Sequence, residues 1–480
     1  MANVRYPRLF NRRTKIIGTI GPATSSSGVI ERLMRAGMNI ARLNLSHGFH
    51  GDHAQYVQTI RKLSQRLGIE VCILMDLPGP KYRTGKLKRG ETFLKRGATV
   101  TLTTRQIDGD SAMLSVNLPN LPQDVRVGDI VLINDGAMKL KVRAINGDEV
   151  ICRVVIGGLL TEKRGLVVPG MHTSVPFITD SLQEHIRFAI KQQPDYLALS
   201  FVSTAKDITA VKAILAENEA DIPLITKIER GIALRHFEEI LTVSDGIMVA
   251  RGDLGVDISL EQLPLVQKEI IKECNRAGKP VITATEMLES MVRVSRPTRA
   301  EVTDVANAIF DGTDAIMLSA ETSIGKYPVQ ALKMMARIAC EVEKELPYDQ
   351  ILEERKAWLE QQTDELISYN ACHTGHSLGV KVIVAFTQSG STAGRISKYR
   401  PKVPVLAITP NPVITARLFL RWGVYPVLIT GSSSMSELFE VGARVAKESG
   451  LAMQGDLIVI TGGIPLGIAG STNLLKVEKI

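Results

Sequence analysis

Eight short apolar runs, separated by segments with helical periodicity, constrain this sequence more than any other feature. The runs are too continuously apolar to be half-exposed strands, which is typical of strands buried on both faces of a parallel sheet. In chain order they are TKIIGTIG, NIARLNL, VCILMDL, DYLALSF, PLITKIE, GIMVARG, PVITATE and AIMLSAE. Several of the helical segments between them end in Gly, as helices commonly do. Eight strand–helix units predict a TIM (β/α)8 barrel.

Two further domains are predicted where the sequence departs from this alternation of apolar runs and helical segments. Residues 80–175 are Gly-punctuated and rich in alternating Thr and Val, so we expect a small antiparallel β-barrel domain inserted after the third strand, as a lid. The barrel then comprises residues 1–79 and 176–345. After the charged helical stretch EKELPYDQILEERKAWLEQQTDELI, the runs VKVIVAFT, VPVLAITP, VYPVLIT and LIVITGG predict a doubly wound α/β domain within residues 346–480.

The composition and charge of the chain indicate which kinds of molecule it binds. The chain has 480 residues, 45% of them hydrophobic, without a signal-peptide pattern or a membrane-spanning run, so a cytoplasmic location without membrane contact is expected. The five cysteines are widely spaced, which favours reduced core residues over disulfides. The net charge is +8, but the cations are dispersed and aromatic residues are 5% of the chain, which argues against nucleic acid. Small phosphorylated or carboxylated metabolites fit this charge better.

Polar side chains close seven of the eight apolar runs. In a TIM barrel the functional residues lie at the C-terminal ends of the strands, and seven runs ending this way favour a shared site over isolated strand-end polar groups. The residues are Arg42, Asn44, Ser46, Asp76, Ser200, Lys227, Glu229, Arg251, Asp253, Thr285, Glu286, Ser319 and Glu321.

The types of these residues indicate one chemistry. Glu229 and Asp253, on neighbouring strands, can bind a hard divalent cation, and Mg²⁺ uses one or two protein carboxylates with substrate and water as its other ligands. Lys227 would lie beside that cation. A lysine, arginines and Mg²⁺ around one point suit phosphoryl transfer, in which the protein supplies mainly position and electric field. A structural ion pair between Lys227 and Glu229 is the alternative that spacing leaves open.

Longer motifs resemble one enzyme family. RRTKIIGTIGPAT, ARLNLSHG, ITKIERGIA, IMVARGDLGV, ITATEMLESM, PTRAEVTDVANAIFDGTDAIMLSAETSIGKYP and TGGIPLGIAGSTN together are similar to pyruvate kinases, in order and over essentially the whole chain. The resemblance implies transfer of the phosphoryl group of phosphoenolpyruvate to ADP, giving ATP and pyruvate, with Mg²⁺ or Mn²⁺ as cofactor. It also implies a homotetramer.

The resemblance assigns roles to residues that match the family's motifs. Glu229 and Asp253 resemble the family's ligands of the divalent metal. Lys227 resembles the cation that stabilises the phosphoryl group during its transfer and the enolate that is left behind. Arg42 and Arg83 are similar to the family's phosphate and nucleotide contacts. Arg83 lies just beyond the hinge, where closure of the inserted domain would bring it over the site.

Further roles concern the substrate carboxylate and the enolate. Thr285 is similar to the threonine placed near the enolate carbon, which the family uses in protonation. The segment of Ala250, Arg251, Gly252 and Asp253 resembles the one that cradles the substrate. Glu286 stands where many relatives have glutamine, and we assign it no ligand role.

The stretch CILMDLPGPKYRTG departs from a common family pattern. Many relatives bind K⁺ through residues matching Asn44, Ser46, Asp76 and the backbone at Leu77, and carry a glutamate where this chain has Lys81. We expect the Lys81 ammonium to occupy or nearly occupy the K⁺ position and supply its charge, as in the K⁺-independent branch of the family. A lysine pointing to solvent at the hinge is the alternative.

A second site is expected in the C-terminal domain. The residues TQSGST follow an apolar strand and open a helix, so they could bind a phosphate, and they match the family's effector loop. They are Thr387, Gln388, Ser389, Gly390, Ser391 and Thr392. TGGIPLGIAGSTN would face them as a flap. Because Gln388 and Ser391 stand where fructose 1,6-bisphosphate-regulated relatives have cations, a sugar monophosphate (glucose 6-phosphate or ribose 5-phosphate) or AMP is the expected effector. A serine-rich helix cap without ligand is the alternative.

Two other functional classes use the same features. A metal-dependent aldolase or lyase could combine the barrel with a Mg²⁺-bound pyruvate enolate, but it would have no evident need for ADP or a lid. A catalytically inactive sensor could bind a phosphorylated metabolite through its C-terminal domain. The intact set of Lys227, Glu229, Asp253 and Thr285 argues against the sensor.

Overall fold

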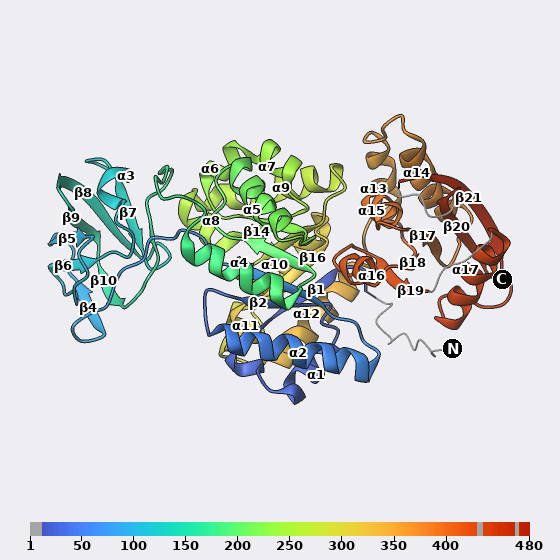
Figure 1. Ribbon diagram of the computed structural model, residues 1–480, viewed down its shortest axis with the longest axis horizontal. Helices are drawn as coiled ribbons and strands as arrows, with labels where there is room; N and C mark the ends of the chain where they lie inside the picture. The colour runs from blue at the N-terminus through green and yellow to red at the C-terminus, as the bar shows by residue number, and fades with distance from the viewer. Residues whose placement is uncertain (1–11, 430–434, 466–469) are drawn as a thin grey trace.

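The computed structural model describes residues 12–429, 435–465 and 470–480. Three bodies are visible in Figure 1: a central barrel, a β-rich insert on one side of it, and an α/β domain on the other. The arrangement confirms the three kinds of domain predicted from the sequence.

All eight predicted runs form strands of one closed parallel barrel. Around the ring the strand order is β1-β16-β15-β14-β13-β12-β3-β2. The strands are β1 (Lys15–Ile20), β2 (Ile40–Asn44), β3 (Cys72–Leu77), β12 (Tyr196–Leu199), β13 (Leu224–Ile228), β14 (Gly246–Ala250), β15 (Val281–Ala284) and β16 (Ala315–Leu318). Nearly every residue in them is buried, as expected for strands covered on both faces.

Helices cover the outside of the barrel. They are α1 (Ser27–Arg35), α2 (His50–Leu67), α4 (Asp180–Gln192), α5 (Ala205–Glu217), α6 (Gly231–Arg235), α7 (Phe237–Val243), α8 (Arg251–Asp257), α9 (Leu263–Arg276), α10 (Arg299–Phe310), α11 (Ala320–Ser323) and α12 (Pro328–Val342), with short 3-10 turns at Pro22–Thr24, Leu260–Gln262 and Glu289–Val292. Helix α10 begins with a capping box, in which Thr298 and Glu301 satisfy each other's backbone N–H groups.

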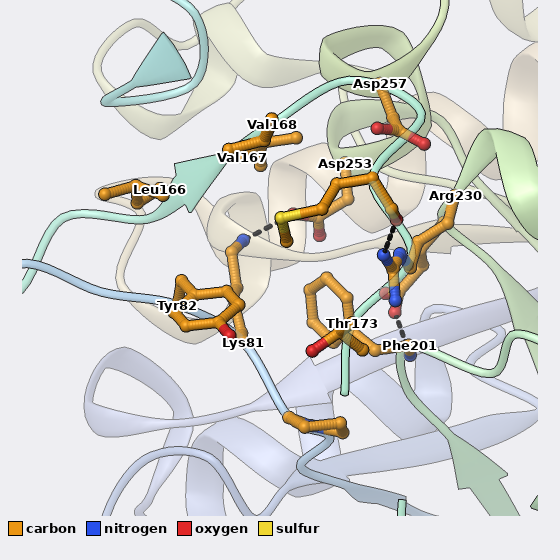
Figure 2. Close-up of a pocket in the computed structure, with 13 residues that line it drawn as sticks. Lys81, Tyr82, Leu166, Val167, Val168, Thr173, Phe201, Arg230, Asp253 and Asp257 are labelled. Atoms are coloured by element: carbon orange, nitrogen blue, oxygen red, sulfur yellow. Dashed lines mark hydrogen bonds and ion pairs between the residues drawn. The ribbon is translucent and has the colours of Figure 1, made fainter. Parts of the chain in front are cut away.

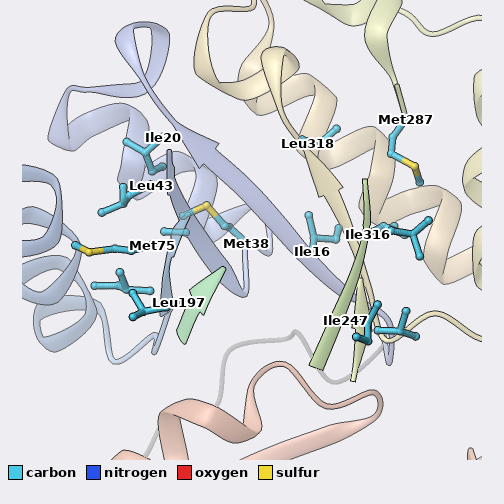
Figure 3. Packing of buried hydrophobic residues seen from close by; sticks show 14 of the residues in the cluster. Ile16, Ile20, Met38, Leu43, Met75, Leu197, Ile247, Met287, Ile316 and Leu318 are labelled. Carbon is cyan, nitrogen blue, oxygen red and sulfur yellow. The ribbon is translucent and has the colours of Figure 1, made fainter. Parts of the chain in front are cut away.

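The barrel has two hydrophobic layers. The outer layer packs strands against helices, and Figure 3 shows Ile16, Met75 and Ile316 among its members. The inner layer fills the barrel with side chains such as Ile17, Leu74 and Met248. Leu420, from the C-terminal domain, belongs to this inner cluster. The N-terminal end of the barrel is therefore plugged by the C-terminal domain.

The insert leaves the barrel after β3 and has its own core. Its elements are β4 (Glu91–Leu94), β5 (Thr99–Thr103), β6 (Met113–Ser115), α3 (Leu121–Asp124), β7 (Ile130–Ile133), β8 (Met138–Asn146), β9 (Glu149–Ile156), β10 (Gly158–Thr161) and β11 (Leu166–Val167). They form a six-stranded and a two-stranded sheet, and the pairs are antiparallel apart from β5 with β6. In Figure 1 the insert extends away from the barrel on two linkers.

The C-terminal domain is a five-stranded sheet with helices. Its elements are α13 (Tyr348–Lys356), α14 (Thr363–Ser377), β17 (Ile383–Phe386), α15 (Ser391–Lys398), β18 (Val405–Thr409), α16 (Pro412–Leu418), β19 (Val424–Leu428), α17 (Met435–Glu448), β20 (Leu457–Gly463) and β21 (Thr472–Lys479). The strand order is β19-β18-β17-β20-β21. The four predicted strands are parallel, and β21 adds an antiparallel edge that the sequence analysis did not anticipate.

Cys72, Cys152, Cys274 and Cys372 are buried free thiols, as predicted, whereas the thiol of Cys340 is only partly buried. Across the three ranges that the structure describes, no helix combines the length and the apolar character needed to cross a bilayer.

Candidate active site

A polar cavity opens at the C-terminal end of the barrel, beside the linker to the insert. Its volume is about 380 Å³. Nine of the predicted site residues line it: Arg42, Asn44, Ser46, Lys81, Arg83, Ser200, Lys227, Glu229 and Asp253. They come from the C-terminal ends of β2, β12 and β13 and the residues just after them, from the start of α8 and from the linker, so the barrel topology brings together residues that are far apart in the sequence.

Asp76, at the end of β3, organises the cations on one side of the cavity. Arg42 donates to its Oδ2 from both Nε and a terminal nitrogen, each at 2.8 Å, and Lys227 Nζ lies 3.2 Å from its Oδ1. Burial would raise the pKa of Asp76, but the charges of Lys227 and Arg42 outweigh burial and hold this pKa below its usual value. Asp76 is therefore an anion that fixes the positions of Arg42 and Lys227.

Lys227 is held between two carboxylates. Its Nζ lies 2.8 Å from Glu229 Oε1 and donates to Ser200 Oγ at 2.8 Å. Burial alone would lower the pKa of Lys227, yet the neighbouring Asp76 and Glu229 raise it above the usual value. The side chain therefore remains a cation although it is only 8% exposed.

Glu229 carries a buried negative charge that is incompletely compensated. Its Oε2 accepts the backbone N–H of Phe201 at 2.6 Å, and Oε1 pairs with Lys227. Its pKa is nevertheless raised, chiefly by burial and also by the nearby Asp253, with Lys227 acting in the opposite sense. Such a pair of carboxylates on a cavity wall favours an added cation.

The donor set fits Mg²⁺ or Mn²⁺ with substrate as the remaining ligand. Glu229 and Asp253 are two hard oxygen donors, and within the described residues no group of three or more His, Cys, Asp or Glu side chains is placed to hold a metal. Mg²⁺ typically takes one or two protein carboxylates and keeps other positions for phosphate oxygens and water. Glu229 and Asp253 could hold such an ion, while a fully protein-built cage is not formed there.

Lys81 points into the site and not into solvent. Its ammonium forms an ion pair with Asp253 Oδ1, and its side chain is 14% exposed. The ammonium also lies 5.2 Å from the centre of the Phe201 ring. Figure 2 shows Lys81, Phe201 and Asp253 around a narrow pocket next to the returning linker. The solvent-pointing alternative is not what this structure shows, although Lys81 reaches Asp253 instead of Asp76.

The other residues of the predicted monovalent-cation set lie near one another. Asn44 and Ser46 line the cavity, and the Ser46 backbone N–H donates to Asn44 Oδ1 at 3.2 Å. Leu77 is completely buried at the end of β3, next to Asp76. The oxygens of Asp76 already bind Arg42, Lys227 and Ser200.

Thr285 and the first turn of α8 form a strained corner beside the cavity. Thr285 and Glu286 both have left-handed backbone conformations, with φ of 68° and 54°, which is costly for residues other than Gly. The N–H of Gly252 donates to Thr285 Oγ1 at 2.8 Å. This bond fixes the threonine against the turn that carries Asp253.

Arg251 supports this corner from behind instead of facing the cavity. It donates to the Thr285 carbonyl at 2.7 Å and pairs with Asp304 at 2.7 Å. Ala250 is buried at the end of β14. Ala250, Arg251, Gly252 and Thr285 are thus adjacent to the cavity without lining it.

Arg83 approaches from the insert. It lines the cavity, and a terminal nitrogen donates to the Lys163 carbonyl at 3.4 Å within the insert. Because Arg83 is carried by the hinge segment, its distance from the barrel residues depends on the position of the insert.

Some contributors were missed by sequence reasoning. Phe201, with a left-handed φ of 59°, supplies the N–H that holds Glu229. Ser200 had been recognised as a strand-end residue without a role, and it bridges Asp76 and Lys227. Asp304, which holds Arg251, had no signal because it lies within an ordinary amphipathic helix.

The phosphate-type loop of the C-terminal domain connects β17 to α15, as predicted. Gly390 has a left-handed φ of 87°, and its N–H donates to Thr387 Oγ1 at 2.9 Å. Thr392 bonds to Thr472 at 2.6 Å, so its hydroxyl is engaged with β21. Ser389 and Ser391 line a cleft of about 730 Å³ that also contains Arg395 and Lys398. Residues 466–469 of the predicted flap lie outside the described residues.

Comparison with known families extends over both large domains. The family described as pyruvate kinase, barrel domain, matches residues 11–332, and the one described as pyruvate kinase, alpha/beta domain, matches residues 365–478.

Individual proteins match over nearly the full chain. The pyruvate kinases of Staphylococcus epidermidis (strain ATCC 12228) and Staphylococcus aureus (strain MRSA252) are each 45% identical over 471 residues, covering 98% of this chain and 80% of theirs. The crystal structure of a pyruvate kinase from Cryptosporidium parvum superposes with a TM-score of 0.92 at 36% identity, covering 98% of this chain and 97% of that one.

Proposed function

Because the chain belongs to the pyruvate kinase family, and is therefore a phosphotransferase that uses phosphoenolpyruvate and ADP, we propose how the residues of the cavity divide this reaction among themselves. The observation that carries the proposal is the Lys227 ammonium, buried between Asp76 and Glu229 on the wall of an open cavity. A permanent cation in such a place can stabilise charge that develops on a substrate.

Glu229 and Asp253 are the proposed ligands of Mg²⁺ or Mn²⁺. When bound, the metal supplies positive charge to the phosphoryl oxygens. The chain must first release the contacts that occupy these carboxylates, namely Lys227 on Glu229 and Lys81 on Asp253. Both lysines line the same cavity, so they can turn from the carboxylates to the anionic substrate.

Lys227 and Arg42 bind the phosphoryl group from the barrel side. Asp76 pre-orients both cations, so little reorganisation is needed when the substrate binds. Lys227 also lies where it can stabilise the enolate that remains after transfer. Arg83 contributes to the nucleotide and phosphate contacts from the insert, and closure of the insert keeps water from the phosphoryl group.

The corner at Gly252 and Thr285 is the proposed site for the substrate carboxylate and for protonation of the enolate. The first turn of α8 offers backbone N–H groups near Asp253, and Gly there permits a close approach. The Thr285 hydroxyl is within hydrogen-bond distance of this turn, at 2.8 Å from the Gly252 nitrogen. Thr285 would hold the proton donor, a water or its own hydroxyl, next to the enolate carbon.

Lys81 replaces the monovalent cation in this proposal. The lysine side chain within the site supplies the charge that K⁺ gives to other relatives, at no cost in binding an ion. Its support is the burial of Lys81 and its ion pair with the metal ligand Asp253. Substrate and divalent metal, by taking over Asp253, would free the ammonium for the neighbourhood of Asn44 and Ser46.

The decisive assay measures pyruvate formation from phosphoenolpyruvate and ADP with Mg²⁺, in buffers free of monovalent metal ions, before and after addition of K⁺. Comparable turnover in both buffers supports the complete proposal. Strong activation by K⁺ would keep the enzyme and overturn the role of Lys81. Absence of turnover in both, with cleavage of a hydroxy-keto acid in a parallel assay, would favour the lyase.

Regulation is assigned to the loop of residues 387–392, within a homotetramer. The geometry of Gly390 and the helix that follows it suits a phosphate, and Arg395 and Lys398 line the adjoining cleft. Glucose 6-phosphate, ribose 5-phosphate or AMP should therefore lower the concentration of phosphoenolpyruvate needed for half-maximal rate. A Ser391→Asp variant, which places negative charge at the helix start, should abolish the effect of a sugar monophosphate.

A further inference from the structure

Four of the eight histidines of the chain lie close together beside the active-site cavity. His47 follows β2, His50 and His53 lie in the first turn of α2, and His185 lies in the middle of α4. His53 Nε2 lies 2.7 Å from the His47 carbonyl oxygen, and His47 and His185 line the cavity. The proposed division of the reaction gives none of these four side chains a role.

His50 and His185 form a hydrogen bond between their rings. Nε2 of His50 lies 2.9 Å from Nδ1 of His185, and the ring centres are 4.9 Å apart in an edge-to-face arrangement. Phe188 holds His50 in turn, because its ring stacks on the imidazole at 4.1 Å with an angle of 1° between the planes. The two contacts fix the orientation of both imidazole rings.

The hydrogen bond to His50 leaves the other ring nitrogen of His185, Nε2, available to a ligand. Within residues 12–429, 435–465 and 470–480, this nitrogen has no hydrogen-bond partner, and His185 is part of the cavity wall. A bond between two neutral imidazoles needs one donor, so when His50 Nε2 carries a proton, His185 Nδ1 accepts it and His185 Nε2 carries the other ring proton. An anion beside Nε2 selects this tautomer, because an anion accepts hydrogen bonds. His50 can therefore make His185 an N–H donor on the cavity wall.

His185 is a neutral ring at neutral pH. Burial lowers its pKa, and His50 and His53 from α2 act in the same sense, whereas Glu184 on its own helix opposes them. The charged side chains on the cavity wall are Arg42, Lys81, Arg83, Lys227, Glu229 and Asp253. Because cations outnumber carboxylates there, the cavity attracts anions, and His185 contributes a hydrogen bond to such a ligand without adding a charge.

The barrel topology places the histidine pair away from the corner assigned to the substrate carboxylate. In the ring of strands β2 lies opposite β14, and α2 follows β2, whereas Gly252 and Thr285 follow β14 and β15. Helix α4 packs against β3 and α2. Burial lowers the pKa of His47, and so does the nearby charge of Arg83, which is assigned to the nucleotide. The anion on this side of the cavity is therefore ADP.

We propose that His185 is a further substrate-binding residue, whose Nε2–H donates to a phosphate oxygen of ADP, and that His50 is the positioning residue that holds His185 in the donating tautomer. The inference rests on the proposed function, in which ADP binds on the side of Arg83. Helix α4 belongs to the barrel, so this contact does not depend on closure of the insert. His185 thus orients the nucleotide before the insert brings Arg83 over the site.

Steady-state kinetics of His185→Phe test the assignment. This variant keeps a flat ring and loses the donor, so the KM for ADP should rise about tenfold, while kcat and the KM for phosphoenolpyruvate stay within about twofold of wild type. His185→Gln keeps an N–H group near the position of Nε2 and should bring the KM for ADP back to within about threefold of wild type. The matched control is His236→Phe, which removes a half-buried histidine between α6 and α7 and should leave all three constants unchanged.

His50→Phe tests the positioning role. Its ring can still stack on Phe188, but it donates no hydrogen bond to His185. The KM for ADP should therefore rise about threefold when His50→Phe is introduced into the wild type, and should not rise further when it is introduced into His185→Phe. A rise of equal size in both backgrounds would overturn the positioning role. Melting curves without ligand establish that each variant is folded.

The outcomes distinguish this inference from the proposed function. If the wild type forms no pyruvate, the proposed function fails, and equilibrium dialysis with radiolabelled ADP and Mg²⁺ decides whether His185→Phe binds the nucleotide more weakly. An unchanged KM for ADP in folded His185→Phe would overturn the assignment and leave the proposed function intact. A rise in the KM for phosphoenolpyruvate, alone or equal to that for ADP, would also overturn it, because His185 would then contact the other substrate or shape the whole cavity.

Discussion

The two ends of the barrel contain the same kinds of buried charge in different surroundings. At the N-terminal end, Asp314 pairs with Arg400 at 2.8 Å and the Lys15 ammonium donates to the Val424 carbonyl at 2.6 Å. The C-terminal domain covers these groups and inserts Leu420 into the barrel. At the C-terminal end, Asp76 pairs with Arg42 and Lys227, but the cluster faces a cavity.

The covers of the two ends also differ. The insert contacts the barrel near its linkers, where Lys81 meets Asp253 and Gly170 donates to Asp257 at 3.2 Å. The C-terminal domain instead shares a hydrophobic cluster with the barrel. A buried ion pair alone does not mark a functional site. The C-terminal end of the barrel differs in that its ion pairs face a cavity and its cover contacts the barrel near the linkers.

The largest expected effect is a loss of kcat when a buried lysine is replaced at the C-terminal end of the barrel, with little loss when a partly buried lysine is replaced elsewhere in the barrel. Replacing Lys227 with Met should lower kcat by about 10³-fold, because the phosphoryl group and the enolate lose a pre-oriented cation. Steady-state assay of pyruvate formation measures the loss. Lys279→Met is the matched control: this lysine holds the carbonyls at the end of α7, at 2.6 Å from Leu241 O, and its removal should spare kcat. A Lys227→Met enzyme within tenfold of wild type would contradict the mechanism.

Replacing one aspartate with asparagine at each end of the barrel, Asp314 or Asp76, compares the two ends in stability and in kcat. Asp314 accepts bonds from Arg400 and from the backbone N–H groups of Val281 and Trp422. Asp314→Asn should therefore destabilise the fold by about 3–5 kcal/mol, since it leaves a buried cation unpaired. Its kcat, corrected for the folded fraction, should stay unchanged.

The same exchange at Asp76 should lower both stability and kcat, since this carboxylate orients Arg42 and Lys227. Urea denaturation and assays on the same samples distinguish the two outcomes. A kcat loss equal in both variants would remove the functional distinction between the ends.

Lys81→Glu tests whether the Lys81 ammonium replaces a bound monovalent cation at the C-terminal end of the barrel. Without monovalent metal ions the variant should turn over about 10–100-fold more slowly than wild type, because a negative charge replaces a positive one near the phosphates. Added K⁺ should restore most of this loss. Lys88 is an exposed lysine of the insert that pairs with Asp110, and Lys88→Glu is the control. Its turnover should not change when K⁺ is added. The role of Lys81 fails if Lys81→Glu shows no response to K⁺.

Much of the barrel could be predicted because its strands are buried on both faces. A continuous apolar run followed by one polar residue, such as the one ending at Asp76, fixes both the strand and the position of the site. The parallel topology then brings Lys227, Glu229 and Arg42 together without further information.

The remaining features depend on contacts that leave no periodic signal. The left-handed Phe201 that binds Glu229, and Arg251 turned away from the cavity toward Asp304, follow from tertiary packing. The antiparallel strand β21 has the partly buried, alternating pattern of an edge strand, which is weaker than that of a central strand. Motif matching assigned the backbone at Arg251 to the substrate carboxylate and gave no role to its side chain, which the structure places against the Thr285 carbonyl and Asp304.

The smallest expected effect concerns the pH dependence of the free energy of unfolding, through Lys15 at the N-terminal end of the barrel, which the C-terminal domain covers. Burial, with the charge of Arg12, lowers the pKa of Lys15 to about 7, against the partial opposition of Glu343 and Asp314. In the unfolded chain the lysine titrates near 10.4. Between these values the unfolded state binds more protons than the folded state, so Lys15 makes the free energy of unfolding rise with pH. Lys15→Met should reduce that slope by up to about 1.4 kcal/mol per pH unit between pH 7 and 10.

Urea denaturation at pH 7.5 and 9.5 measures this slope in the wild type and in Lys15→Met. Lys344, an exposed lysine paired with Glu341, provides the control, and Lys344→Met should keep the wild-type slope. Because Lys15 lies far in the sequence from the Val424 carbonyl it binds, the effect reports on the junction that closes the barrel. An unchanged slope in Lys15→Met would mean that the ammonium stays charged when buried, and that the closed end, like the open one, holds its cations by pairing.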